Sequence, residues 1–480
     1  MDLHQKVDDF AASIGVPPDN IKLVSCLLFS WAVAPLLPLL PSPNAKHLAN
    51  IGLSLFFLVG VLRLYEGTVQ LLATALLVYV MVKFRIGGKN MPWFVFVVQM
   101  SHMTYTHIHR QIADIPRTTL EISAMQMVLC MNLTTFAWDC YDGGRPIEKL
   151  DAEQAAVRIE KLPSLIEFYG YCFFFPGVLV GPSNRYANYK AWSTGALYGY
   201  KMPNGRLAAS LVQLAIAVVS LIAVAVIAPS WQYDQLIDPK HPVSSAPFLQ
   251  RVLHMQLSGF AARFPYYGAW SLANAGCIMS GMGYNGLNDD GKPRWNRCAN
   301  LDIPAIEFAN NIKELADAWN INTSVWLRNY VYKRVTPPGK NPGAASSMIT
   351  FLVSALWHGL YPGYFYTFVY LGFLQQTAKL YRKAFRPVFY ENVRTPNPSF
   401  TTLANYSPAQ LAYSTAGIIV NQLALNFAAA PFMVLTMIDS TRVYNAVYWY
   451  GVIGVLVSLG ATQLGFIRFM RQFHIKNKAQ

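Results

Sequence analysis

One histidine of the sequence lies where an ionisable side chain is energetically unfavourable. His358 is in the middle of the apolar run 344–375, and an ionisable side chain inside a membrane-embedded segment indicates a functional site by default. A neutral imidazole can act as a general base near neutral pH. Gly359 and Gly363 allow close approach of a helix or a substrate, and Pro362 loosens the helix so that a polar recess can form. The alternative is a core histidine that is hydrogen-bonded across helices, and these residues alone do not separate the two interpretations.

A second group of candidate residues lies upstream, in the polar stretch 285–340. Within it, residues 305–332 have the pattern of an amphipathic helix followed by a second helical segment, with Pro304 in the first turn and Pro337 and Pro338 ending it. Amide side chains on aromatic-rich helices indicate a buried polar cavity; the alternative is a solvated loop whose aromatic rings anchor it at the membrane interface. The stretch contains Asn285, Asn288, Asn296, Asn300, Asn310, Asn311, Asn320, Asn322 and Asn329, with Trp295, Trp319 and Trp326.

The elements that must position these residues are predicted to be membrane-spanning helices. Of the 480 residues, 54% are hydrophobic and only 13% are charged, which is about half of the charged share of an average soluble protein. Because roughly 20 apolar residues in a helix span a bilayer core, we predict an all-α polytopic integral membrane protein with about 11 transmembrane helices. The candidate spans are residues 21–40, 48–65, 69–84, 92–104, 119–138, 164–180, 207–229, 248–284, 344–375, 411–437 and 444–470.

The remaining segments and the overall charge complete the predicted organisation. A polar N-terminal segment (1–20) precedes a single multi-span domain (21–470), and a basic tail (471–480) follows it. The net charge of +14 lies in short loops, which is typical of cytosolic loops beside an anionic leaflet. Nucleic acid is not an expected partner, because no nucleic-acid-binding motif accompanies the charge. The six cysteines form no CxxC pair, so neither a zinc site nor a redox motif is indicated.

Several motifs resemble those of a known family. Residues 357–364, WHGLYPGY, resemble the histidine motif of the membrane-bound O-acyltransferase (MBOAT) superfamily and, within it, of the lysophospholipid acyltransferase branch. Residues 319–334, WNINTSVWLRNYVYKR, resemble the asparagine motif of that branch. All of the matches run in family order along the chain, and three further blocks resemble that branch: DGGRP (142–146), FPGVLVGP (175–182) and GMGYNG (281–286).

The resemblance implies an MBOAT fold and an acyl-CoA-dependent O-acyltransferase. Acyl-CoA is then a co-substrate, and neither a cofactor nor a metal is expected. The catalytic pair of the family carries over to His358 and Asn320; Asn322 competes for the second position, and the motif register favours Asn320 because it directly follows Trp319. The implied substrate-binding residues are Trp357, Tyr284, Asn285, Asn300, Glu307, Asn322, Trp326, Arg328, Lys333 and Arg334.

These residue types suit acyl transfer from a thioester to an alcohol. The glycerol hydroxyl of a lysophospholipid is a weak nucleophile, and His358 can take its proton as it attacks the thioester carbon. The amide of Asn320 can stabilise the resulting oxyanion or orient His358, and both roles stay open. We expect direct transfer, because no serine or cysteine lies in a nucleophile motif such as GxSxG. Arg328, Lys333 and Arg334 could bind the phosphates of coenzyme A; the alternative is positive-inside topology with contacts to lipid headgroups.

Other patterns among the histidines compete weakly with this interpretation. His109 and Asp114 have the His-x4-Asp spacing of a different acyltransferase family, but the later FPEG motif of that family is matched only by FPG at 175–177. His102, His107 and His109 lack a carboxylate or cysteine set at ligand spacing, so we expect histidines at the membrane interface rather than a metal site.

The function predicted from the sequence is transfer of a fatty acyl chain from acyl-CoA to the free hydroxyl, at sn-2, of a lysophospholipid. Alternatives are an MBOAT enzyme with a sterol, diacylglycerol or protein acceptor, or a non-enzymatic transporter, which no internal repeat supports.

Lys476 and Lys478 resemble a dilysine retrieval signal of the endoplasmic reticulum; the alternative is a plain basic tail, and both place the C-terminus in the cytosol. We therefore expect a multi-pass protein of the endoplasmic reticulum membrane, with membrane lipids among its partners. Residues 322–324 match the N-glycosylation sequon. We expect that this match is accidental and that Asn322 is not glycosylated.

Overall fold

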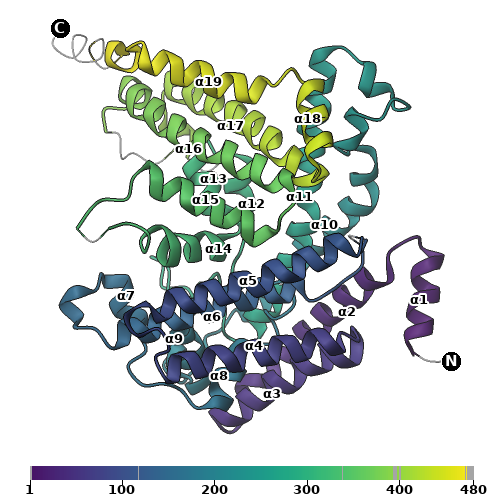
Figure 1. Cartoon of the computed structure of the whole chain (residues 1–480), viewed down its shortest axis with the longest axis vertical. Helices are drawn as coiled ribbons and strands as arrows, with labels where there is room; N and C mark the ends of the chain where they lie inside the picture. The colour runs from purple at the N-terminus through teal and green to yellow at the C-terminus, as the bar shows by residue number, and fades with distance from the viewer. Residues whose placement is uncertain are drawn as a thin grey trace. The chain divides into compact units, whose positions relative to one another are not determined.

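The computed structural model describes residues 3–116, 118–337, 339–392, 397–398, 402–470 and 472, and it is mainly helical (Figure 1). The described residues form no β-strand and only two isolated bridges, Leu287–Pro293 and Leu301–Trp319. The predicted all-α class is therefore confirmed. The α-helices up to the middle of the chain are α1 (Leu3–Ser13), α2 (Pro18–Val33), α3 (Pro43–Leu55), α4 (Tyr65–Lys83), α5 (Met91–Ile112), α6 (Ser123–Gly143), α7 (Ala152–Val157), α8 (Leu165–Cys172), α9 (Tyr186–Thr194), α10 (Arg206–Val226) and α11 (Phe248–Met279).

The second half of the chain contains both long and very short helices. Ser407 is the N-cap of α17, which has Pro408 in its first turn, and Thr436 is the N-cap of α18. These helices are α12 (Ile303–Glu307), α13 (Ile312–Ala318), α14 (Ile321–Trp326), α15 (Ala344–His358), α16 (Pro362–Phe389), α17 (Pro408–Val434), α18 (Met437–Ala446) and α19 (Tyr450–Gln463), and the π-helical segment η9 (Leu327–Tyr332) follows α14 directly.

The chain divides into two compact units, which are interleaved in the sequence. Unit 1 comprises Met1–Leu221, Tyr266–Asn300 and Val325–Tyr330; unit 2 comprises Ile222–Pro265, Leu301–Ser324 and Val331–Gln480. The prediction of a single catalytic domain over 21–470 therefore stays a prediction. The basic tail, apart from residue 472, lies outside the described residues.

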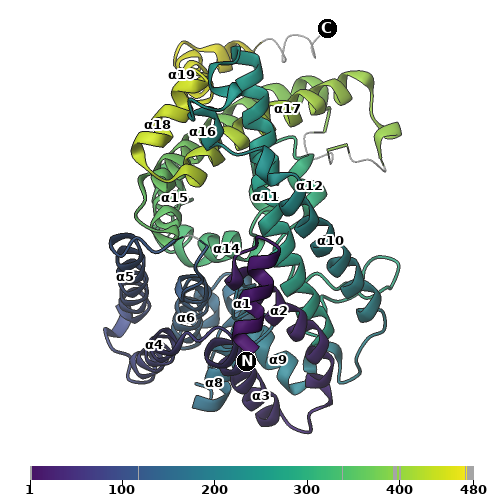
Figure 2. The same ribbon diagram turned by 90° about the vertical axis from the view of Figure 1, so that its right-hand side faces the viewer.

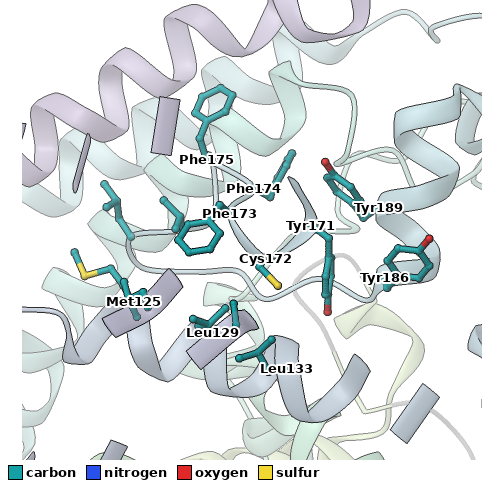
Figure 3. Close-up of a cluster of buried hydrophobic side chains, with 14 of the residues drawn as sticks. Met125, Leu129, Leu133, Tyr171, Cys172, Phe173, Phe174, Phe175, Tyr186 and Tyr189 are labelled. Atoms are coloured by element: carbon teal, nitrogen blue, oxygen red, sulfur yellow. The ribbon is translucent and has the colours of Figure 1, made fainter. Parts of the chain in front are cut away.

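Unit 1 is built around an aromatic core. Phe173, Phe174 and Phe175 follow α8 and lie close to Tyr171 and Tyr189 (Figure 3). Helices α5 and α6 pack side by side in this unit, as do α3 and α8. After α8 ends at Cys172, the three consecutive phenylalanines are all buried.

Unit 2 contains α15, α16 and α17, which lie side by side (Figure 2). Its core is centred on Phe427 of α17, whose ring is stacked on that of Tyr444 at a centroid distance of 4.0 Å. The ring of Tyr370, from α16, lies 5.2 Å from the ring of Phe427.

Within the described part of the chain, five helical segments are long and apolar enough to cross a membrane: Pro18–Leu39, Pro43–Val61, Tyr65–Lys83, Arg206–Leu236 and Pro408–Val434. The pair Met437–Ala446 and Tyr450–Gln463, which is bent by 77°, makes a sixth if it is one broken span. These six segments match six of the predicted spans, and the multi-pass character of the chain is confirmed. The number of eleven stays a prediction.

Three segments of the sequence prediction need correction. The run 344–375 is not one span, because α15 ends at His358 and α16 begins at Pro362. Of the predicted span 164–180 only Leu165–Cys172 is helical, which is too short to cross a bilayer. The pattern over 305–332 forms three short helices and a π-helical segment rather than two helical segments, because Asn310, Asn311 and Asn320 lie at breaks, where asparagine competes for backbone hydrogen bonds.

Candidate active site

His358 is the last residue of α15, and the chain breaks immediately after it. Gly359 has φ 129°, a conformation that L-residues rarely adopt, so glycine is required there. Its N–H donates to the carbonyl oxygens of Ala355 and Leu356, at 3.2 and 3.1 Å, and so closes the helix. Tyr361 is extended and Pro362 starts α16. The motif therefore forms a helix end, a three-residue break and a helix start, with the imidazole on the edge of the break.

Four aromatic rings surround the imidazole of His358. The ring of Phe368 is stacked on it at 5.2 Å, and the rings of Trp357 and Phe432 meet it edge-on at 4.8 and 4.9 Å. Tyr364 lies at 5.7 Å. His358 is half-buried, whereas Trp357 is buried. These contacts place the half-buried imidazole in an apolar, aromatic setting.

Asn320 lies at the break between α13 and α14 in a left-handed backbone conformation, φ 45°. Asparagine is one of the few non-glycine residues that adopt it readily. Its side-chain Oδ1 accepts a hydrogen bond from Thr323 Oγ1 at 2.8 Å, and its carbonyl oxygen accepts one from the N–H of Ser324 at 3.0 Å. The residue before it, Trp319, is bridged to Leu301. The amide group is thus oriented by its own helix start.

Helix α12, which lies before α13 in the chain, is joined to α11 by an ion pair whose arginine is buried. The guanidinium of Arg263, from α11, donates to both carboxylate oxygens of Glu307, at 2.9 and 2.7 Å, and also to Asn426 Oδ1 at 2.6 Å. Gln422 donates its amide N–H groups to the carbonyl oxygens of Ile306 and Glu307 at the end of α12, both at 2.9 Å. Glu307, predicted to bind substrate, therefore has a clear structural role in joining α11, α12 and α17.

The other predicted residues of unit 2 lie close to Asn320 in the sequence. Asn322 is half-buried within α14, and Thr323 of its sequon is buried. Such a helical, covered site is a poor glycosylation acceptor, which agrees with the expectation of an accidental sequon. Lys333 and Arg334 are half-buried and follow the π-helical segment η9.

The remaining predicted residues belong to unit 1. Trp326 is buried and its indole N–H donates to Thr134 Oγ1 at 2.9 Å, so it has a packing role in that unit. Tyr284 contacts the ring of Trp295 at 5.8 Å, and Asn285 donates its amide to Asn296 Oδ1 at 3.0 Å. Asn300 is buried, and Arg328 is exposed. The predicted site residues are therefore divided between the two units: His358, Asn320, Trp357, Glu307, Asn322, Lys333 and Arg334 belong to unit 2.

Sequence reasoning missed three residues that touch the catalytic candidates. Phe368 and Phe432 contact His358, and Thr323 donates to Asn320. Phe368 is four residues after Tyr364, so the helical repeat from the motif could have indicated it. Phe432 had no such signal, because it lies on a different helix far along the chain.

The fold and this site define a class of protein: a multi-pass, all-α membrane protein with a histidine at a broken helix and an asparagine at a second helix start. The model of the MBOAT, membrane-bound O-acyltransferase, family matches residues 108–405. The chain belongs to the membrane-bound O-acyltransferase family, as the sequence motifs predicted.

Relatives cover nearly the whole chain. The chain is 38% identical over 459 residues to the lysophospholipid acyltransferase of Schizosaccharomyces pombe, covering 94% of this chain and 87% of that protein. It is 34% identical over 463 residues to the lysophospholipid acyltransferase of Saccharomyces cerevisiae, covering 91% of this chain and 72% of that protein. It is 31% identical over 459 residues to the membrane-bound glycerophospholipid O-acyltransferase 1 of Mus musculus, covering 91% of this chain and 88% of that protein.

Proposed function

We propose that this chain is a lysophospholipid acyltransferase that transfers a fatty acyl chain from acyl-CoA to the free sn-2 hydroxyl of a lysophospholipid. The observation that carries the proposal is the setting of His358, a titratable side chain at a helix break inside an apolar, aromatic environment. The names of the fungal and mouse relatives support the acceptor class.

In the proposed reaction His358 is the general base. The imidazole takes the proton of the glycerol hydroxyl as its oxygen attacks the thioester carbon of acyl-CoA. Collapse of the tetrahedral intermediate breaks the C–S bond, and the imidazolium returns the proton to the departing sulfur, so that coenzyme A leaves as the thiol. The imidazolium that forms is at the C-terminal end of α15, where the partial negative charge of the helix stabilises a cation. The surrounding rings exclude water, which would otherwise compete with the lipid hydroxyl for the thioester.

Asn320 is the proposed partner of His358. Its Nδ2–H₂ group is a donor that can stabilise the oxyanion or orient the imidazole. The hydrogen bond from Thr323 to Oδ1 supports this role, because it leaves the amide in one orientation with the oxygen toward Thr323. Of the two asparagines that compete for the catalytic position, Asn320 is the one with the left-handed backbone.

The donor and the compartment are part of the same proposal. Lys333 and Arg334, which follow the asparagine motif, and Arg328 carry the positive charge that the phosphates of coenzyme A would require. The chain is proposed to reside in the endoplasmic reticulum membrane with a cytosolic C-terminus, on the side where acyl-CoA is available.

An acceptor panel tests the proposal. The purified chain in detergent is given labelled oleoyl-CoA with a lysophosphatidylcholine, a lysophosphatidylethanolamine, a lysophosphatidic acid, a sterol and a diacylglycerol, and the release of coenzyme A is measured with the labelled lipid product. We expect product from lysophospholipids and not from the sterol or the diacylglycerol. Acylation of only the sterol or the diacylglycerol, or no release of coenzyme A with any acceptor, would refute the proposal.

A further inference from the structure

The C-terminal end of α17 contains a strained turn. Leu435 has φ 67° and ψ −49°, and the N–H of Thr436 donates to the carbonyl oxygen of Val434 at 2.8 Å. These three residues form a γ-turn with a positive central φ, which is a rare and strained arrangement. For a leucine such a conformation persists only where the surrounding structure holds it, and strain of this kind concentrates at active sites.

The turn at Leu435 is held by a backbone contact with Gly363 of the histidine motif. The N–H of Gly363 donates to the carbonyl oxygen of Leu435 at 2.8 Å, and the N–H of Leu435 donates to the carbonyl oxygen of Pro431 at 2.9 Å. A Cβ atom on Gly363 would lie 2.0 Å from the carbonyl oxygen of Pro431 and 2.9 Å from the Cα of Leu435. The backbone of the motif and the end of α17 are therefore in direct contact, which only glycine permits.

Phe432 follows Pro431 in α17, and its ring contacts the imidazole of His358. Its ring is edge-on to His358 at 4.9 Å with an interplanar angle of 83°, and it lies 4.8 Å from the ring of Tyr364. The ring of Phe368, in contrast, is stacked on the imidazole with an interplanar angle of 18°. Phe368 stacks on the imidazole, and Phe432 meets it edge-on. Together these two rings leave the imidazole little freedom to rotate.

We propose that Phe432 is a positioning residue for His358 and that the strained turn at Leu435 fixes Phe432 in place. This inference rests on the proposed function, in which His358 is the general base. Phe432 and Leu435 lie after residue 405, the last residue that the family model matches, so the motifs of the family gave no indication of either.

The test compares two substitutions at one position. Phe432→Leu keeps an apolar side chain and removes the flat ring, whereas Phe432→Tyr keeps the ring. We expect Phe432→Leu to lower kcat by at least about tenfold, because a small displacement of a catalytic group slows the reaction strongly. The KM for each substrate should stay within twofold of the wild-type value. Phe432→Tyr should restore kcat to within threefold.

A matched control separates positioning from packing. Phe427 is on the same helix, is fully buried and contacts the rings of Tyr370, Tyr444 and Tyr450. Phe427→Leu should lower the melting temperature in detergent more than Phe432→Leu does, with kcat per folded molecule within twofold of wild type. An equal loss of kcat in both leucine variants would mean that Phe432 acts only through packing, and would overturn the inference.

His358→Ala, assayed in parallel, separates this inference from the proposed function. If His358→Ala is inactive while Phe432→Leu keeps the wild-type kcat, the positioning role is wrong and the proposed function stands. If His358→Ala retains wild-type activity, both fail together, since there is then no base to position.

Discussion

Asn320 combines two properties at one residue: an amide that can take part in the reaction and a backbone conformation that few side chains tolerate. Its φ of 45° lies in the left-handed region, where a non-glycine residue other than asparagine or aspartate is disfavoured by roughly 1–2 kcal/mol. Replacement by alanine therefore changes chemistry and backbone strain together. Substitution of Asn320 by glycine removes the amide without adding backbone strain, so it tests the role of the amide separately from the strain.

We expect both Asn320→Gly and Asn320→Ala to lower kcat by at least about a hundredfold, the scale of a lost oxyanion donor. The melting temperature of the glycine variant should equal or exceed that of the alanine variant. Steady-state release of coenzyme A and thermal unfolding in detergent measure the two effects. Asn322→Ala is the control and should stay within about fivefold of wild type. A fully active glycine variant would exclude the amide of Asn320 from the reaction.

At the residue scale the sequence predicted the two catalytic candidates but not their surroundings. His358 and Asn320 were indicated by short contiguous motifs, because each motif encodes its own local break in a helix. Phe432 lies more than seventy residues after His358, and a contact between two helices leaves no pattern in a single sequence. Glu307 was predicted as a substrate ligand, and only the structure reveals that its carboxylate pairs with Arg263.

The proposed catalytic residues of unit 2 lie at helix ends rather than in helix interiors. His358 ends α15, Asn320 precedes α14, and Leu435 follows α17. Hydropathy averaged over a window cannot detect such ends, which is why the run 344–375 looked like one span. Gly359 breaks the run, because its φ is 129°. An average of hydropathy nevertheless treats Gly359 as one more small apolar residue.

The ion pair between Arg263 and Glu307 provides a prediction at the scale of elements, because it joins α11 to α12. Removing one partner of a buried pair leaves an uncompensated charge and typically costs about 3–5 kcal/mol, whereas replacing both partners by apolar residues is often neutral. We therefore expect Arg263→Met and Glu307→Met each to lower the melting temperature in detergent clearly, and the double variant to recover most of the loss.

The control for this prediction is an exposed ion pair on the neighbouring helix α13. Lys313 pairs with Asp317 there, with side chains that are 79% and 51% exposed. Such pairs contribute at most about 1 kcal/mol, so Lys313→Ala should leave the melting temperature nearly unchanged. Equal melting temperatures for the three variants at Arg263 and Glu307 would contradict a bracing role for the buried pair.

At the scale of the whole molecule, composition was enough to predict the class of the fold but not the number of spans. Helices such as α6 and α11 are long enough to cross a bilayer, yet they contain buried polar residues, including Asp139, Asn132 and Arg263, which lower their mean hydropathy. Polar residues buried in such helices lower the mean hydropathy, so an average over the sequence does not decide whether these helices cross a membrane. The division into two units, whose residues alternate along the chain, also has no sequence signature.

The central claim is that one imidazole in this chain removes the proton of a lysolipid hydroxyl. The most direct test measures coenzyme A release with oleoyl-CoA and a lysophospholipid for wild type, His358→Ala and His254→Ala. His254 is a buried histidine of the same unit that contacts the carbonyl oxygen of Gln232, and its variant should keep kcat per folded molecule within about threefold. We expect His358→Ala, folded as judged by its melting temperature, to lose at least about a hundredfold in kcat. A folded His358→Ala variant with the kcat of wild type would contradict the account.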